Sequence, residues 1–164
     1  MDPVVARDAA RQLHGGQRNR FGEAVIDHVA RVQAAVPAEA RTVAWLHDVL
    51  EGPGVTCQEL QARGLSAVEI EALELLTHAP TESYRSYVER IARAGGPAGA
   101  LARAVKLADL DDHLAHGTIP AGAPPYAWAR RRIADAVSSG WGDASPPAVD
   151  ESDRHVSEQK PRST

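Results

Sequence analysis

Glycine and proline divide this chain into a series of segments with helical patterning, and that division limits the possible folds more than any other feature. No apolar alternation with a period of two is long enough to predict a strand. Aromatic residues make up only 4% of the chain, and alanine, leucine and valine supply most of the apolar content, which favours helices. We expect an all-α fold, with helices over residues 3–13, 23–35, 37–51, 82–94 and 97–113 and another from about 124 onward.

Two further helices are predicted by capping boxes. In this motif a Ser or Thr and a Glu three residues later each bond a backbone N–H that the first helical turn leaves without a partner. Thr56 and Glu59 fit the motif ahead of a short helix, and Ser66 and Glu69 fit it ahead of a longer one. The middle of the chain is therefore expected to be helical as well.

The size and charge of the chain limit what it can bind. Its 164 residues suit one domain. We expect that domain over residues 1–142, followed by a disordered tail over 143–164 with almost no apolar content. The net charge of −4 argues against binding to duplex nucleic acid, which needs a basic face, but permits a small anionic substrate at a locally positive site.

Other sequence features concern cross-links and compartment. Cys57 is the only cysteine, so a disulfide within the chain and a cysteine-rich zinc site are both excluded. The N-terminus lacks a signal-peptide pattern, and no apolar run approaches the roughly 18 residues of a membrane span. We therefore expect a cytoplasmic protein that does not enter a membrane.

Three places in the chain put metal-ligand residue types on expected helices with apolar neighbours. They are His28, the pair His47-Asp48, and Asp109. Neutral imidazoles together with carboxylates suit a divalent transition metal such as Mn²⁺, Fe²⁺ or Zn²⁺. Glu51 follows His47 by four residues, so on one continuous helix it would lie on the same side and could act on a water molecule at the metal.

The same residues, taken one at a time, also fit ordinary structural roles. A His-Asp pair is common in proteins, and a single histidine such as His28 could be an ordinary interior or surface residue. Asp109 could simply pair with Lys106 on one helix turn.

A phosphate ligand would need cations, and arginine can bind it with two parallel hydrogen bonds. The cations near the candidate ligands in the sequence are Arg20, Arg85, Arg90 and Lys106.

Short blocks of sequence around these residues resemble one known family. In order, the blocks are His14-Gly-Gly-Gln17, Ile26-Asp-His28, Ala44-Trp-Leu-His-Asp-Val-Leu-Glu51, Leu75-Leu-Thr77-His78, Tyr84-Arg-Ser-Tyr87 and Val105-Lys-Leu-Ala-Asp109-Leu110. Within an all-helical chain they resemble the HD-domain metal phosphohydrolases. The sequence of these blocks is most similar to the guanosine tetraphosphate (ppGpp) hydrolases related to the RelA/SpoT hydrolase domain and to their small stand-alone relatives.

This resemblance implies a fold and a set of site residues. The fold would be an HD-domain helical bundle with a central metal site. His28, His47, Asp48 and Asp109 would be the four metal ligands. Mn²⁺ would be the usual metal, with Fe²⁺ or Zn²⁺ as alternatives. Glu51 would match the first residue of the family's Glu-Asp pair, which acts on the attacking water, and would therefore be the catalytic residue.

Several positions depart from the family pattern, and they concern substrate handling. Gly52 replaces the second acid of the Glu-Asp pair. In the family's basic pair before the first metal histidine, Asn19 replaces the first residue and Arg20 keeps the second. Asp112-His113 replaces the family's His-Asn after the last metal aspartate. The substrate-binding residues implied in this chain are Arg20, Lys106 and His113.

We therefore expect a metal-dependent phosphohydrolase acting on a small-molecule nucleotide, with removal of the 3′-pyrophosphate of (p)ppGpp as the leading activity. One alternative is a nucleotidase or nucleotide pyrophosphatase of the same superfamily with another substrate. The other is a non-catalytic nucleotide-binding module on an HD scaffold, which Gly52 and Asp112-His113 favour. Metal affinity should fall as the pH drops through about 6.5, because the ligand histidines must be neutral to bind.

Overall fold

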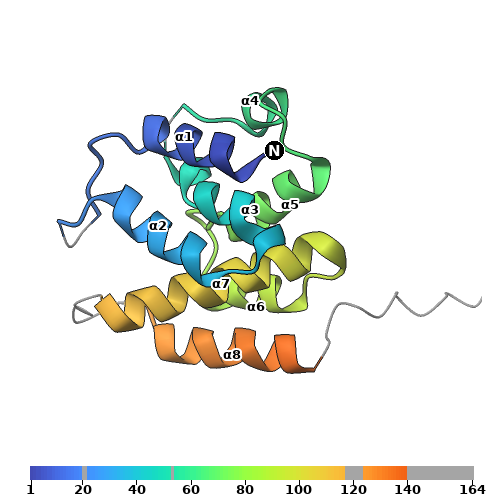
Figure 1. Cartoon of the computed structure of the whole chain (residues 1–164). Coiled ribbons are helices and arrows are strands. Elements are labelled where there is room, and N and C mark those ends of the chain that lie inside the picture. The colour runs from blue at the N-terminus through green and yellow to red at the C-terminus, as the bar shows by residue number, and fades with distance from the viewer. Residues whose placement is uncertain (20–21, 53, 117–123, 140–164) are drawn as a thin grey trace, which may run out of the picture.

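The computed structural model describes residues 1–19, 22–52, 54–116 and 124–139, and every regular element in these ranges is helical. Within them we find no strand, only an isolated antiparallel bridge between Arg18 and Ala24. The predicted all-α fold is confirmed for this part of the chain (Figure 1). The elements are α1 (Pro3–Leu13), α2 (Val25–Ala35), η1 (Ala38–Ala40), α3 (Arg41–Leu46), η2 (Val49–Glu51), α4 (Cys57–Ala62), α5 (Ala67–Leu76), α6 (Tyr84–Arg93), α7 (Gly96–His116) and α8 (Tyr126–Ser138), where η marks a 3₁₀ turn.

Helix starts that depend on local side-chain bonds lie where the sequence predicts them. Both capping boxes form, at Thr56 with Glu59 and at Ser66 with Glu69, and in each the side chains bond each other's backbone N–H. α1 has the predicted bounds, and its first turn is capped by Asp2, whose carboxylate accepts from the N–H of Val4 at 2.7 Å. α7 extends three residues beyond the predicted end at 113, to His116.

The predicted continuous helix over 37–51 is wrong. That segment consists of η1, α3 and η2, and His47 and Asp48 form a turn between the last two. The Nδ1 atom of His47 lies 2.9 Å from the carbonyl oxygen of Ala44, which in a continuing α-helix would accept the N–H of Asp48. His47 and Asp48 keep backbone angles in the right-handed helical region, and His47 Nε2 lies 3.1 Å from Asp48 Oδ1.

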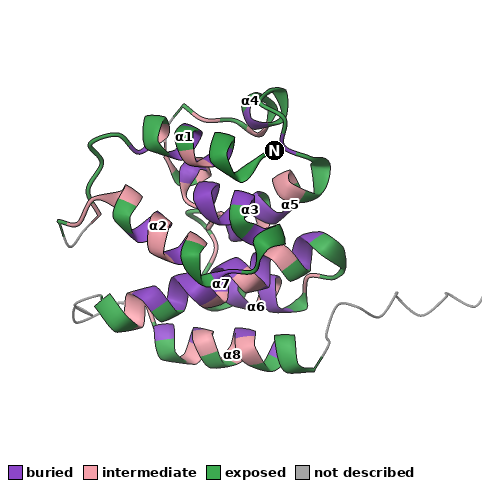
Figure 2. Ribbon diagram, in the orientation of Figure 1, coloured by how far each residue is buried: buried purple, intermediate pink, exposed green. Residues whose placement is uncertain are grey.

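α3 and α7 form the centre of the bundle. α3 contacts α1 and α2 on one side and α5 and α7 on the other, and its residues from Thr42 to Leu46 are all buried. α7 is 21 residues long and contacts α2, α3, α5, α6 and α8 (Figure 1). Its buried residues appear as a purple stretch through the middle of the molecule in Figure 2. Side chains at the end of α3 and along the inner face of α7 are therefore held in the core.

Some predictions concern residues outside the described ranges. These are the substrate-binding role of Arg20, the domain boundary at 142 and the disordered tail over 143–164. Among the helices that the structure describes, none has both the length and the apolar character that crossing a membrane requires.

Candidate metal centre

Three segments that are distant in sequence bring histidine and aspartate side chains together. His28 comes from α2, His47 and Asp48 from the turn after α3, and Asp109 from α7. The structure assembles them as two groups: His28, His47 and Asp48 form the first, and His28, Asp109 and His113 form the second. Within each group the candidate ligand atoms all lie within 4.8 Å of one another. His28 belongs to both groups, and no group among the described residues holds all four predicted ligands.

His47 presents an unused nitrogen to this cluster. Because a carbonyl only accepts hydrogen bonds, the contact with Ala44 O places the proton of the neutral ring on Nδ1 and leaves the lone pair on Nε2. That Nε2 atom is buried and has no hydrogen-bond partner among the described residues, because Asp48 Oδ1, 3.1 Å away, is also an acceptor. A buried polar atom without a partner requires a physical reason, and a metal ion bound at Nε2 would supply one.

His28 is oriented by Asp112, which in turn pairs with Arg31. Its Nδ1 donates to Asp112 Oδ2 at 2.8 Å, and its Nε2 lies 3.3 Å from Asp109 Oδ1. Arg31 holds the Asp112 carboxylate with two hydrogen bonds, from Nε at 2.6 Å and from Nη2 at 2.9 Å. Burial raises the pKa of Asp112, but the hydrogen bonds from Arg31 and His28 outweigh it and lower that pKa to about 2. A carboxylate behind a histidine is a common arrangement at metal sites, because it fixes the ring and makes Nε2 a better donor.

The two oxygen atoms of the Asp109 carboxylate contact different groups. Its Oδ2 accepts from Lys106 Nζ at 2.7 Å, whereas its Oδ1 faces His28 Nε2 and lies 3.1 Å from His113 Nε2. Burial would raise the pKa of Asp109, yet the charge of Lys106 and the bonds from His113 and His28 hold it well below its usual value. The sequence leaves pairing with Lys106 and metal binding as alternatives for Asp109. In the structure Asp109 pairs with Lys106 through Oδ2 and joins the histidine cluster through Oδ1.

The donor set suits a divalent ion. The two groups offer imidazole nitrogens and ionised carboxylates from buried or half-buried side chains, the ligand types that Mn²⁺, Fe²⁺ and Zn²⁺ accept. The structure thus contains a His/Asp cluster that could hold a metal ion. The identity of the metal stays a prediction.

Glu51 lies beside this cluster, at the end of η2. The residue as a whole is exposed, but its carboxyl group is close enough to Asp48, Lys106 and His47 for their charges to change its pKa. Partial loss of water raises the pKa of Glu51, and the negative charge of Asp48 raises it further. A backbone hydrogen bond from His78 and the positive charge of Lys106 act in the opposite direction. A carboxylate whose pKa is raised accepts a proton more readily near neutral pH.

Of the cations predicted around the site, Lys106, Arg85 and Arg90 have partners in the structure, and Arg20 lies outside the described residues. Lys106 is buried, with its ammonium on Asp109 and 5.1 Å from the centre of the Tyr87 ring. Arg85 lies over the ring of Trp128, and Arg90 pairs with Glu82 at 2.8 Å. Arg90 also donates to the carbonyls of Leu75 and Thr77 at the end of α5. The structure therefore gives Arg85 and Arg90 structural contacts, and the substrate-binding role of Lys106 stays a prediction.

Sequence reasoning missed the roles of Asp112 and Arg31. Both follow a predicted ligand by three residues, Asp112 after Asp109 and Arg31 after His28, so helical periodicity could have placed them on the same helix faces. It also missed a ring cluster beside the site, in which Tyr84 has a buried hydroxyl with no hydrogen-bond partner among the described residues. The rings of this cluster are His78, Tyr84, Tyr87, His113 and Tyr126.

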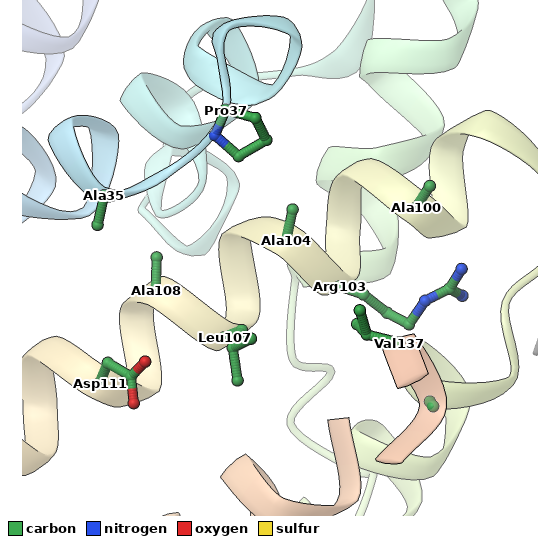
Figure 3. A pocket seen from close by; sticks show the side chains of 10 residues that line it. Ala35, Pro37, Ala100, Arg103, Ala104, Leu107, Ala108, Asp111 and Val137 are labelled. Atoms are coloured by element: carbon green, nitrogen blue, oxygen red, sulfur yellow. The ribbon is translucent and has the colours of Figure 1, made fainter. Parts of the chain in front are cut away.

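A separate cavity of about 380 Å³ lies along another face of α7 (Figure 3). Half of its lining residues are alanines, and Arg103 and Asp111 are the charged ones. The α7 residues that line the cavity, such as Ala104 and Ala108, are not members of the metal cluster. The cavity is therefore not part of the candidate metal centre.

A scan against protein-family models found no match to this chain, and a search of curated proteins found no similar sequence. Membership of the HD-domain family accordingly stays a prediction that depends on the sequence blocks around the cluster.

Metal uptake near pH 7.5 is expected to release about one proton per ion from the protein. Burial lowers the pKa of His28, but the hydrogen bond and charge of Asp109, together with Asp112, outweigh it and raise that pKa to about 9. A metal ion must displace the proton of His28, so metal affinity should keep rising by up to about tenfold per pH unit until pH 9, beyond the limit of 6.5 expected from the sequence. Calorimetry in two buffers of different ionisation enthalpy measures the released proton.

The same raised pKa makes an independent prediction for the metal-free protein. Because His28 binds its proton more tightly in the folded state than in the unfolded state, its protonated ring stabilises the fold fully below pH 6.5, and this contribution is lost as the pH rises through about 9.

Metal affinity that stays constant between pH 7 and 9 would contradict protonation of His28.

Asp112→Asn is expected to weaken metal binding by about 10- to 100-fold, because the amide keeps the shape of the carboxylate but loses the charge that orients His28. Titration with Mn²⁺ or Co²⁺ measures the change. Asp111→Asn is the matched control, since Asp111 is the neighbouring residue on α7 and pairs with Arg130 instead. Equal metal affinity in the two variants would show that Asp112 does not support His28.

Proposed function

We propose that this chain is a metal-dependent phosphohydrolase that acts on a nucleotide, with the 3′-pyrophosphate of (p)ppGpp as the leading substrate. The observation that carries the proposal is the buried, unpartnered Nε2 of His47 within a cluster of histidines and carboxylates, with Glu51 beside it. The sequence blocks that resemble the ppGpp hydrolases supply the substrate class.

Each residue of the cluster has a role in this proposal. His28, His47, Asp48 and Asp109 would hold a divalent ion, which when bound would act as a Lewis acid toward water and a phosphoryl oxygen. Glu51, with its raised pKa, would orient the attacking water and take its proton. Attack at the 3′ substituent would release pyrophosphate and leave GDP or GTP.

The positions at which the chain departs from the family that it resembles concern substrate handling. Gly52 has φ −85° and ψ 156°, an extended conformation open to any residue. Among the described residues, a Cβ at this position would meet only the carbonyl of Val49, at 3.7 Å. The backbone therefore does not require glycine here, and the missing second acid is a chemical difference. It motivates the alternative of a related nucleotidase or nucleotide pyrophosphatase.

The test begins with elemental analysis of the purified protein, followed by assays with Mn²⁺ on ppGpp, pppGpp and ordinary nucleotides. Release of pyrophosphate from ppGpp supports the leading activity, and turnover confined to other nucleotides supports the alternative enzyme. Tight nucleotide binding without turnover with any divalent metal supports a non-catalytic module and contradicts the proposal. The absence of metal, of nucleotide binding and of turnover rejects all three.

A further inference from the structure

His113 lies against the metal cluster, although the sequence gives it a substrate-binding role. It follows Asp109 by four residues on α7, so both side chains emerge from the same face of the helix. Its Nε2 is 3.1 Å from Asp109 Oδ1, and its side chain is 24% exposed. With His28 and Asp109 it forms the second group of candidate metal ligands.

Two flat neighbours fix the orientation of the His113 ring. It stacks on the ring of His28, with centres 4.8 Å apart and an angle of 24° between the planes. It also stacks on Tyr126 of α8, at 5.1 Å and 7°. A side chain held in this way loses little further freedom when it binds an ion, so the site is organised in advance.

His116, one turn further along α7, provides the contrast. Its side chain is 56% exposed, and its Nδ1 contacts Asp112 rather than Asp109. It belongs to no group of candidate metal ligands among the described residues. Position on α7 and chemical type are therefore similar for the two histidines, whereas only His113 reaches the cluster.

The shared residue His28 limits how many ions the cluster can hold. Its Nδ1 is engaged by Asp112, so only Nε2 offers a lone pair for a metal. One lone pair serves one ion, and separate ions in the two groups could not both use His28. We propose that a single ion draws on both groups and that His113 is its third histidine ligand, beside His28 and His47. This inference depends on the metal binding in the proposed function and extends it, because the family resemblance implies only two histidine ligands.

A third imidazole changes which metal the site prefers. Imidazole nitrogen suits Fe²⁺, Zn²⁺ and similar ions, whereas Mn²⁺ favours sites richer in carboxylate and water. A donor set of three histidines and two aspartates should therefore bind Co²⁺, a spectroscopic substitute for Fe²⁺ and Zn²⁺, well ahead of Mn²⁺. Because most sites of nitrogen and oxygen donors already bind Co²⁺ ahead of Mn²⁺, the effect expected of the third imidazole is a wider margin between the two affinities.

The experiment compares the full-length wild-type protein with His113→Gln, His113→Asn and the matched control His116→Gln. Co²⁺ and Mn²⁺ affinities are measured by competition with a chelator, and the visible absorption of bound Co²⁺ reports its ligands. Both changes at His113 are expected to lower Co²⁺ affinity at least about tenfold, to lower Mn²⁺ affinity less and to alter the Co²⁺ spectrum. His116→Gln should match the wild type in all three measurements.

The amide variants keep a group that can donate to Asp109, which protects the fold if hydrogen bonding is the only role of His113. Unchanged Co²⁺ affinity and spectrum in either folded variant would overturn the inference, and circular dichroism identifies which variants are folded. Pulsed EPR of the wild-type protein with Mn²⁺, which counts the bound imidazoles, gives a test without any variant: three supports the inference, and two overturns it. Nucleotide turnover is assayed separately, so metal binding through His113 without turnover would reject the proposed function alone.

Discussion

Asp48→Ala is expected to abolish metal binding and nucleotide turnover together. The carboxylate of Asp48 supplies the negative charge of the group that it forms with His28 and His47, and its Oδ1 lies 3.1 Å from His47 Nε2. Without it, Asp109 would be the one carboxylate ligand left to offset the charge of a divalent ion bound across both groups. We expect metal affinity to fall at least about 100-fold, more than for loss of a supporting residue, and turnover to fall to the background rate.

This loss should not reflect unfolding. The Asp48 side chain is 34% exposed and lies in a turn, so its removal should change the free energy of unfolding of the metal-free protein by less than about 1 kcal/mol. Metal content, a titration with Mn²⁺ and thermal unfolding of the metal-free variant separate the two effects. Asp111→Ala is the control, because it removes a carboxylate from α7 that pairs with Arg130 and belongs to neither ligand group. A stoichiometric metal content in Asp48→Ala would remove Asp48 from the ligand set.

The sequence predicts those parts of the fold that local interactions determine. The capping boxes at Thr56 and Ser66 form because each motif satisfies its own helix end within four residues. The break after α3 could not be read from the same rules, because apolar periodicity continues through His47 to Leu50. There the ring of His47 bonds the carbonyl of Ala44, the acceptor that the N–H of Asp48 would use in a continuing α-helix.

The candidate site shows the same division between local and long-range information. His28, His47 and Asp48 could be selected by residue type and family resemblance, and the structure brings them together. The support of His28 by Asp112 joins residues 84 positions apart in the sequence. Such a contact depends on how α2 packs against α7, which a single sequence does not specify. The substrate-binding role of Arg20 stays a prediction, because this residue lies outside the described ranges.

Glu51→Gln is expected to leave metal binding intact and to lower turnover by about 10²- to 10⁴-fold, the usual contribution of a general base. Glu51 belongs to neither group of candidate ligands, yet Asp48 and Lys106 are close enough to influence its pKa. The amide can still orient a water molecule, but it cannot accept the proton that water loses on attack. The variant therefore separates the chemical role of the carboxylate from its position.

The pH dependence of the reaction gives this prediction a second measurement. Because partial burial and Asp48 raise the pKa of Glu51, the wild-type rate should fall as the pH drops through a value above that of an ordinary glutamate. That decline should vanish from the residual activity of Glu51→Gln once metal loading is held constant. Glu39→Gln, a change at an exposed residue of η1, should behave as the wild type. If Glu51→Gln instead loses the metal, Glu51 is a ligand, and the water must be activated by another group.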